Sequence, residues 1–512
     1  MKRLKNYVKE NKIFSIIFPV MAVYYGFLMF YVKPWYDELY TYYSFISRGP
    51  LYAAIHWPVP NNHILYSVLS AFLDFFGNPY IGLRGISFLA CLLNMVLLYE
   101  FAKKIVSKNL AAVSVLLYVS AYQINNLSVQ GRGYTLTITF YLMALHCLYE
   151  ICMTGGGKVH YIFFAVALTG GLYTIVSSTY WVLPVCLAGG LYLLHEKKYR
   201  TLLNLILSAV AAAVATLFLY SVVWLAIGSN LLCKDPESIY YGIYQLRIIG
   251  KAPLTALKTG MEYMLATPYI QGDTRSYIVA ELFHYLTGVF QLHYLGMGEF
   301  LTVFLFAGAV LTVIYFIRTG RKKETDSFFC IYLTVSAVML PVMLIIQSVQ
   351  PYYRVFSFFS VPLTLLIVCM LQFFISKLKK ETGRRRGSGI VLAAAALFCG
   401  LVLMRPDYHA QYAQRETEIA GITEDVYQDI SSICYMDDFQ KYVFKFYYDI
   451  EPEEAAVGTA RYLLMPKEVE DGEGQIPQWP TLYSYDSVDW QQIDKTYSVI
   501  KESDHYRLYL HQ

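Results

Sequence analysis

Two adjacent carboxylates, Asp37 and Glu38, are the residues of this sequence best placed to do chemistry. They follow the first membrane-length apolar segment by a few residues. Charged side chains are costly in hydrocarbon, so we expect both acids at the membrane surface, level with the lipid headgroups. A carboxylate at that height could accept a proton in a reaction on a lipid-linked substrate. The alternative is an ordinary solvated loop, and the remaining sequence has to distinguish the two.

Three arginines, Arg84, Arg132 and Arg354, are each expected at the end of an apolar segment, on the same side of the membrane as the two acids. A guanidinium is always charged and can bind phosphate through two parallel hydrogen bonds. Each arginine could instead be an anchor whose charge reaches the headgroups. Because arginine and lysine are depleted on the outer side of membranes, three outer arginines favour a phosphate-binding cavity.

A second polar group, Asn61-Asn62-His63, closes the loop that begins with the two acids. The segment Trp57-Pro58-Val59-Pro60 precedes it. Because proline restricts the backbone of itself and its neighbour, we expect a rigid loop held against the membrane surface. Asn62 and His63 are therefore candidate substrate-binding residues.

Several familiar motifs are missing or incomplete. Gly155-Gly156-Gly157-Lys158 lacks the Ser or Thr that ends a phosphate-binding loop, so we interpret it as a flexible turn. The sequence after residue 404 contains no Asp-x-Asp, and no zinc-type Cys-x-x-Cys occurs anywhere. We therefore predict no metal site and no required cofactor; a divalent metal is an alternative that no motif supports.

The elements that must position these residues are membrane-spanning helices. Of the 512 residues, 56% are hydrophobic and only 15% charged, against roughly a quarter charged in soluble proteins. About 20 apolar residues span a bilayer as a helix. The shorter apolar stretch 64–77 suits an interfacial helix or a partial span. We predict an all-α, polytopic bundle of about 11 spans, near 13–32, 82–102, 109–127, 133–153, 160–178, 180–195, 202–228, 299–317, 328–348, 355–376 and 388–404.

Positive charge predicts the orientation of this bundle, because cytoplasmic loops are enriched in Lys and Arg. Five basic residues precede the first span, which places the N-terminus in the cytoplasm. Every strongly basic short loop, including Lys377 to Arg386, then also falls inside. Loops 33–63 and 229–298 fall outside, as does everything after residue 404. We therefore expect a multi-pass protein of the plasma (inner) membrane with an extracytoplasmic C-terminal domain.

That C-terminal segment, residues 405–512, is predicted to be a separate unit from the transmembrane domain 1–404. It contains 9 Lys and Arg against 21 Asp and Glu, so its formal net charge is −12. It is rich in aromatic residues, which argues against disorder. Residues 497–501 and 505–510 alternate around a polar turn, as in a β-hairpin. We expect a small α/β domain.

In their order along the chain, these motifs resemble the GT-C superfamily of polytopic glycosyltransferases, and within it glycosyltransferase family 39, which includes protein O-mannosyltransferases and bacterial aminoarabinose transferases. The resemblance covers roughly residues 30–365. Relatives commonly have His-Pro where this chain has His63-Ile64. The sequence contains no Trp-Trp-Asp motif, which argues against the oligosaccharyltransferase branch. The residues that carry the resemblance to glycosyltransferase family 39 are Asp37-Glu38, Asn62-His63, Phe76-Gly77, Gly82-Leu83-Arg84-Gly85, Arg132-Gly133-Tyr134, and Arg354 with Pro362.

The resemblance implies a function in the bacterial cell envelope. An inverting enzyme would move a sugar from a polyprenyl-phosphate donor to an acceptor hydroxyl on a lipid, glycan or protein. Asp37 would be the base and Glu38 its support, while Asn62, His63, Arg84, Arg132, Tyr134 and Arg354 would bind substrate. One base suffices for single displacement, and arginines can stabilise the leaving phosphate without a metal.

Two other classes of protein stay open at this point. A transporter or flippase of lipid-linked sugars would be expected to show internal repeats and ionisable residues deep in its spans, and neither is clear here. A structural or adaptor protein would leave the outer arginines and Asp37 without a purpose. Membrane lipids are expected partners and nucleic acid is not.

Overall fold

The computed structural model forms two compact units. The first, which we call the membrane unit, comprises Met1–Met29 and Phe45–Tyr408, and the second, the tail unit, comprises Phe30–Ser44 and His409–Gln512. The tail unit thus contains the segment with Asp37 and Glu38, in addition to the residues after 408. The residues that the structure describes are 2–58, 61–229, 231–232, 249–266, 274–319, 324–378, 380–405, 408, 413–426, 434–469, 485 and 488–512.

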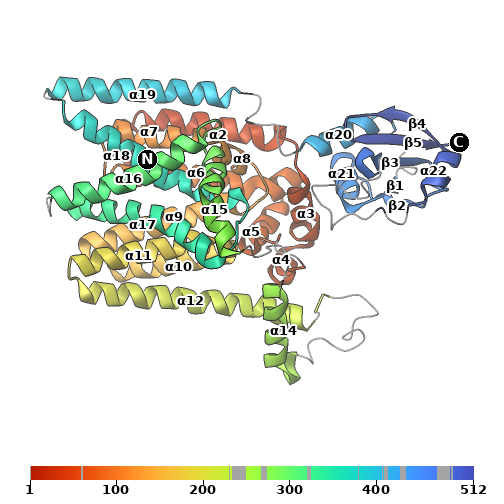
Figure 1. The fold of residues 1–512 in the computed structure, drawn as a ribbon, viewed down its shortest axis with the longest axis horizontal. Helices are drawn as coiled ribbons and strands as arrows, with labels where there is room; N and C mark the ends of the chain where they lie inside the picture. The colour runs from red at the N-terminus through yellow and green to blue at the C-terminus, as the bar shows by residue number, and fades with distance from the viewer. Residues whose placement is uncertain are drawn as a thin grey trace. The chain divides into compact units, whose positions relative to one another are not determined.

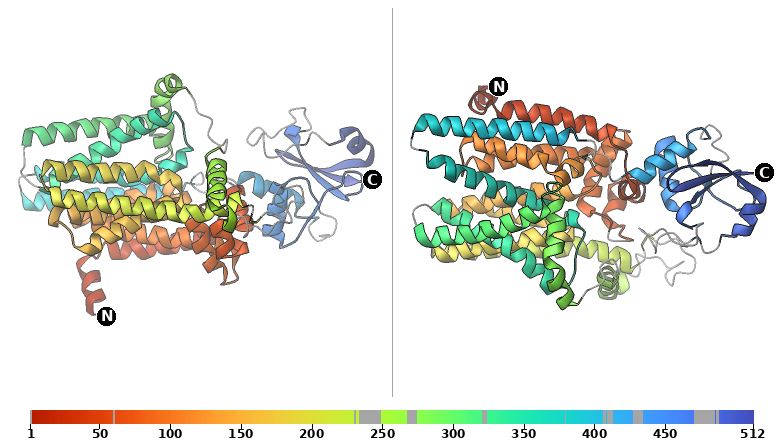
Figure 2. Two further views of the ribbon diagram at one scale, coloured as in Figure 1. Left: turned by 90° about the horizontal axis from the view of Figure 1, so that it is seen from below. Right: turned by 45° about the horizontal axis from the view of Figure 1, so that its top comes forward.

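The membrane unit is helical, and Figures 1 and 2 show its long helices running side by side. A bundle of this kind is the structure expected of helices that are apolar on all sides. Its helices are α1 (Lys2–Glu10), α2 (Phe14–Tyr31), η1 (Ile46–Arg48), α4 (Pro50–Ile55), α5 (Ile64–Asp74), α6 (Pro79–Ala102), α7 (Lys108–Ser120), α8 (Tyr122–Leu127), α9 (Tyr134–Thr154), α10 (Lys158–Thr174), η2 (Val176–Ser178), α11 (Thr179–His195), α12 (Tyr199–Gly228), α14 (Pro253–Ala266), α15 (Arg275–Gln291), α16 (Gly298–Thr319), α17 (Glu324–Gln347), η3 (Tyr353–Phe359), α18 (Ser360–Ser376) and α19 (Glu381–Leu403).

Every predicted span coincides with an apolar helix, but not every helix is long enough to cross a membrane by itself. Among the described residues, eight helices meet both the length and the hydropathy expected of a span. The other three predicted spans correspond to α7, α10 and α16, of which α7 has only 13 residues and is followed by the separate helix α8. The predicted helical membrane fold is confirmed, whereas the count of eleven stays a prediction.

Helix α12 shows how the sequence marks a face for lipid. Leu203, Leu207, Val210, Val214 and Leu217 recur at intervals of three or four residues, so they share one face of the helix. All five are between 53% and 61% exposed. A continuous apolar face of this kind is unfavourable in water and suits contact with lipid tails.

The centre of the bundle packs closely because small residues face large ones. A Cβ added to Gly171 of α10 would lie 2.3 Å from Trp181 of α11, and one added to Gly170 would lie 2.5 Å from Phe140 of α9. Glycine therefore lets the three helices approach at this level, as is usual in membrane proteins. This packing fixes the end of α9 from which Tyr134 projects.

The tail unit combines helices with two small sheets. The strands β3 and β4 both pair antiparallel with β5, and β1 pairs parallel with β2. The hairpin predicted around residues 502–504 is confirmed as β4 and β5, and so is the small C-terminal sheet domain. The elements of this unit are α3 (Tyr36–Ser44), α20 (Gln414–Thr423), β1 (Cys434–Tyr435), α21 (Asp438–Tyr448), β2 (Glu453–Glu454), β3 (Tyr462–Pro466), α22 (Trp490–Thr496), β4 (Tyr497–Glu502) and β5 (Tyr506–His511).

Helix α3 is packed into the core of the tail unit. Tyr36 and Leu39 are buried in the same apolar cluster as Phe439, Val443 and Ile419. The rings of Tyr36 and Phe439 are stacked, with centroids 5.0 Å apart. The sequence had assigned residues 33–63 to an outer loop of the transmembrane domain; by its contacts, the first part of that loop belongs with the C-terminal residues.

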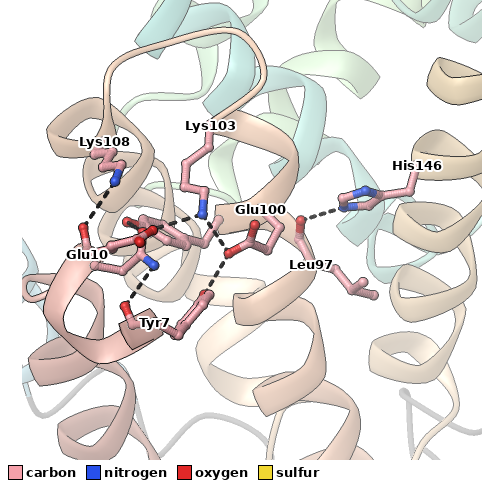
Figure 3. Close-up of polar contacts among 9 residues, drawn as sticks. Tyr7, Glu10, Leu97, Glu100, Lys103, Lys108 and His146 are labelled. Atoms are coloured by element: carbon pink, nitrogen blue, oxygen red, sulfur yellow. Dashed lines mark hydrogen bonds and ion pairs between the residues drawn. The ribbon is translucent and has the colours of Figure 1, made fainter. Parts of the chain in front are cut away.

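A cluster of paired charges ties α1 to the C-terminal end of α6 (Figure 3). Glu100 Oε1 accepts hydrogen bonds from Tyr7 Oη at 2.6 Å and from Lys103 Nζ at 2.9 Å. Lys103 Nζ also donates to Asn11 Oδ1 at 3.3 Å. Lys104 forms an ion pair with Glu150 of α9. The lysines that the orientation rule places in the cytoplasm are therefore matched here by acids of the same unit.

Candidate functional site

His63 lies at the centre of a polar cluster in the membrane unit, immediately before α5. Its side chain is buried, and Nδ1 accepts a hydrogen bond from the backbone N–H of Gly133 at 2.8 Å. An imidazole nitrogen that accepts carries no proton, so in the neutral ring the proton lies on Nε2. Nε2 is 3.4 Å from Nη2 of Arg132. Two N–H donors therefore lie side by side.

The surroundings of His63 keep the imidazole neutral. Burial, and then the nearby guanidinium groups of Arg132 and Arg354, hold the pKa of His63 well below its ordinary value of 6.5. Burial and a neighbouring positive charge both oppose protonation of a histidine. At neutral pH His63 thus offers one N–H donor and leaves the positive charge to the arginines.

Arg132 is buried and held by the loop that closes before His63. Its Nη1 donates to the backbone oxygen of Asn61 at 3.1 Å and also contacts Asn61 Oδ1. The turn that carries Arg132 is also attached to α6, because Ser87 Oγ of that helix donates to Gln130 O at 2.6 Å. These contacts orient the guanidinium before any ligand binds.

Arg354 enters the cluster from η3. Its Nε donates to the hydroxyl of Tyr134 at 3.1 Å, and its guanidinium stacks over the ring of Tyr352 with 4.6 Å to the centroid. Tyr134 begins α9, and its ring meets His63 edge-on, with centroids 5.0 Å apart. The structure therefore brings together four of the predicted binding residues, His63, Arg132, Tyr134 and Arg354, from separate parts of the sequence.

The glycine of the Arg-Gly-Tyr motif is required by this close approach. A Cβ at Gly133 would lie 2.7 Å from Thr174 Cγ2 and 3.1 Å from His63 Nδ1. Any side chain there would displace the imidazole from the N–H of residue 133. The glycine thus has a packing function beside the chemistry of its two neighbours.

Two further predicted binding residues make structural contacts. The Asn62 amide nitrogen donates to Ala53 O at 2.9 Å and to His56 O at 2.7 Å, and Asn62 Oδ1 accepts from Ser67 at 2.8 Å. Arg84 is completely buried, and its Nη1 donates to Met29 O at 2.9 Å. Asn62 thus closes its loop, and Arg84 satisfies a carbonyl at the end of α2 that has no partner within the helix. Their predicted substrate contacts stay predictions.

The two candidate catalytic acids lie in the first turn of α3, in the tail unit. Glu38 is completely buried, and its Oε2 accepts from the backbone N–H of Trp35 at 3.3 Å. A glutamate three residues into a helix commonly reaches back to the residue before it in this way. The Asp37 side chain is only partly buried. Of the pair, Asp37 is thus the acid more accessible to a substrate.

The predicted meeting of Asp37 with the three arginines stays a prediction, since the acids and the arginines belong to different compact units. Sequence reasoning missed two residues: Asn61, which holds Arg132, and Glu416, which accepts a hydrogen bond from the backbone N–H of Tyr36, next to Asp37. Asn61 stood beside the predicted Asn62. Glu416 had no sequence signal, because it lies 378 residues from Glu38.

A comparison with protein families finds a match to part of the membrane unit. Residues 64–225 match the family model described as dolichyl-phosphate-mannose-protein mannosyltransferase. This part of the chain contains Arg84, Arg132 and Tyr134 and begins directly after His63. The predicted resemblance to GT-C enzymes is confirmed, and so is the predicted enzyme class, glycosyltransferase. No curated protein sequence matches the chain.

Two solved structures of one protein share the fold of this chain. The chain is similar to ArnT from Cupriavidus metallidurans bound to undecaprenyl phosphate, at 13% identity, with a TM-score of 0.58 and coverage of 97% of both chains. The apo form of the same protein gives 11% identity, a TM-score of 0.57 and the same coverage. The Archaeoglobus fulgidus oligosaccharyltransferase gives 15% identity and a TM-score of 0.48, covering 81% of this chain and 56% of that one. The first two similarities extend over both units.

Proposed function

We propose that this protein is an inverting glycosyltransferase that moves a sugar from a polyprenyl-phosphate donor to an acceptor hydroxyl at the outer face of the membrane. The observation that carries the proposal is the cluster in which the Nε2–H of His63 and the guanidinium of Arg132 lie side by side, with Arg354 close enough to depress the pKa of the same imidazole. Adjacent N–H donors with positive charge are the groups that bind a phosphate oxygen.

The reaction would be a single displacement. The acceptor oxygen attacks the anomeric carbon C1 of the sugar while its proton passes to the carboxylate of Asp37. The bond between C1 and the phosphate oxygen breaks, and its electron pair stays on the phosphate. Arg132 and Arg354 would stabilise the charge that develops there. Attack from the face opposite the phosphate inverts the configuration at C1.

Glu38 would support this base without taking the proton itself. Its side chain is buried at the N-terminus of α3 and bonded to the backbone of Trp35. A donor with a polyprenyl phosphate is supported by the shared fold, because ArnT from Cupriavidus metallidurans has been solved with undecaprenyl phosphate bound. The acceptor would be a hydroxyl of a lipid, glycan or protein. The mechanism requires no metal, since the two arginines supply the positive charge.

The same proposal includes a membrane orientation, with the N-terminus in the cytoplasm and α3 and the C-terminal domain outside. A single cysteine introduced near Asp37, or into the exposed surface of β4 at Val499, should react with an impermeant thiol reagent in intact cells. A cysteine in the basic segment Lys377–Arg386 should react only after the membrane is opened. Labelling of that basic segment from outside would invert the orientation, and a donor from the outer leaflet would then be excluded.

The alternative function is transport or flipping of a lipid-linked sugar. A transfer assay in vesicles of purified protein separates the two, with undecaprenyl phosphate carrying radiolabelled mannose, glucose or aminoarabinose tested singly against a membrane extract as acceptor. An enzyme releases undecaprenyl phosphate and labels the acceptor, and it should continue to do so in EDTA. Movement of the intact labelled lipid across the vesicle membrane without release of its sugar would instead favour the transporter.

A further inference from the structure

The N-terminus of α3 presents backbone donors that need partners. The first N–H groups of any helix have no acceptor within it. In α3, the N–H of Tyr36 donates to Glu416 Oε1 at 2.5 Å, and the N–H of Trp35 donates to Glu38 Oε2 at 3.3 Å. Glu416 comes from α20, 380 positions from Tyr36 in the sequence. One of the acids that hold this helix end thus comes from the C-terminal domain.

Glu416 is held firmly in place by the helix that carries it. Its side chain is only 2% exposed. On one side of it, Arg415 forms an ion pair with Glu468. On the other, Glu418 Oε1 accepts from Ser503 Oγ and from the N–H of His505, each at 2.5 Å. With Ile419 in the apolar core, α20 is anchored through three residues that flank or follow Glu416.

The charge state of Glu416 fits a role beside two other acids. Burial, together with the negative charges of Glu38 and Asp37, raises the pKa of Glu416 to about 8. Burial and neighbouring negative charge both favour the protonated form of a carboxyl group. At neutral pH Glu416 is then mostly a neutral carboxyl whose C=O still accepts from Tyr36.

From these contacts we infer that Glu416 is a positioning residue, which fixes the first turn of α3 and thereby the Asp37 carboxylate. The C-terminal domain on this account contributes the residue that orients the proposed base within its own unit. The inference rests on the proposed function, in which Asp37 is the base. It concerns geometry, and it therefore has a readout that does not depend on turnover.

The first test measures hydrogen–deuterium exchange of the α3 backbone in the purified full-length protein. Glu416→Ala removes the acceptor, so exchange in the peptide that contains Tyr36 to Leu39 should rise at least about 10-fold, as the first turn opens. Glu416→Gln keeps an oxygen acceptor of the same shape and should stay near wild type. Thr417→Ala is the matched control, because Thr417 is an exposed residue of the same helix that is not among the contacts that anchor Glu416. Equal exchange in Glu416→Ala and the control would overturn the inference.

The second test measures turnover of the same variants with the labelled undecaprenyl-phosphate sugars. Glu416→Ala should lower kcat about 10-fold and change the KM for the donor little, since the donor phosphate is bound by arginines of the other unit. Glu416→Gln should restore kcat, which a purely electrostatic role of an ionised acid would not allow. Unchanged kcat in Glu416→Ala despite faster exchange would overturn the positioning role.

The two tests separate failure of this inference from failure of the proposed function. If wild-type protein transfers none of the sugars, the proposed function is in doubt, and the exchange experiment still decides whether Glu416 fixes α3. If wild type is active, Asp37→Asn inactive and Glu416→Ala normal in both readouts, the proposed function stands and the inference fails.

Discussion

The two ends of helix α6 hold positive charge in different ways. At its C-terminal end, Lys103 pairs with Glu100, and Lys104 of the following turn pairs with Glu150. Near its N-terminal end, Ser87 holds the turn that carries Arg132, and the contacts of that guanidinium include Asn61 and the neutral His63. Residues 84 and 100 are about 24 Å apart along the helix at 1.5 Å per residue. The two lysines thus pair with acids, whereas the contacts of Arg132 include neutral groups.

The difference teaches how a structural charge can be distinguished from a functional one. A lysine that is paired with an acid of the same unit contributes to folding and to the position of α1. The groups that orient the guanidiniums of Arg132 and Arg354 include a carbonyl oxygen, an imidazole and a phenol, and a guanidinium can bind a phosphate through two parallel hydrogen bonds. Sequence alone treats both as basic residues at the end of a helix.

The largest effect on transfer should come from substituting Asp37, the proposed base. Asp37→Asn preserves the shape of the side chain but removes the proton acceptor, so kcat should fall by at least ~10²-fold. Glu38→Gln should be milder, because its contact with the backbone of Trp35 can be kept by an amide oxygen. Asp438→Asn, an exposed acid of the same unit, is the control for the transfer assay. Normal turnover in a folded Asp37→Asn protein would remove Asp37 from the mechanism.

A smaller but more specific effect is expected at Arg354. Lysine keeps the charge but cannot make two parallel hydrogen bonds or hold the Tyr134 hydroxyl through Nε. The KM for the lipid-phosphate donor should therefore rise about 10-fold in Arg354→Lys, while the KM for the acceptor changes little. Arg132→Lys should act in the same direction. If either variant altered only the amount of protein in the membrane, that arginine would be an anchor.

The smallest effect should come from the opposite end of α6. Glu100→Gln removes the acid that Tyr7 and Lys103 share, and a partly exposed pair of this type contributes at most about 1 kcal/mol to stability. Transfer activity per folded molecule should stay at the wild-type value, and the midpoint of thermal unfolding should fall slightly. A loss of donor binding in Glu100→Gln would contradict the assignment of this cluster to folding.

Much of the fold could be predicted because the length and apolarity that a membrane span requires can be seen within a single segment of the sequence. Each apolar segment of suitable length became a helix, and the alternation around residues 502–504 became the β4–β5 hairpin. Length was the less certain quantity: the segment 109–127 divides into α7 and α8 at Ala121, where the backbone leaves the helical conformation. A hydropathy pattern does not reveal a break inside an apolar segment.

The candidate site was predictable where residue type limits the chemistry. Arginines at helix ends and a histidine after a proline-rich sequence indicated phosphate binding, and His63, Arg132 and Arg354 do share one cluster. The membership of α3 in the tail unit could not be predicted, because it depends on contacts with residues about 400 positions away. For the same reason, Glu416 could not be distinguished from the other acids of the C-terminal segment.

The central claim is that the arginines near the N-terminal end of α6 bind the phosphate of a polyprenyl lipid. The lysines at the C-terminal end of α6 do not. The most direct test is native mass spectrometry of the purified protein titrated with undecaprenyl phosphate. Wild type and Lys104→Arg should bind one lipid with the same affinity. Arg354→Lys should bind at least about 10-fold more weakly, as expected for the loss of about 1.5 kcal/mol in one charge-assisted hydrogen bond. Equal binding by all three proteins, or weakening only in Lys104→Arg, would contradict the account.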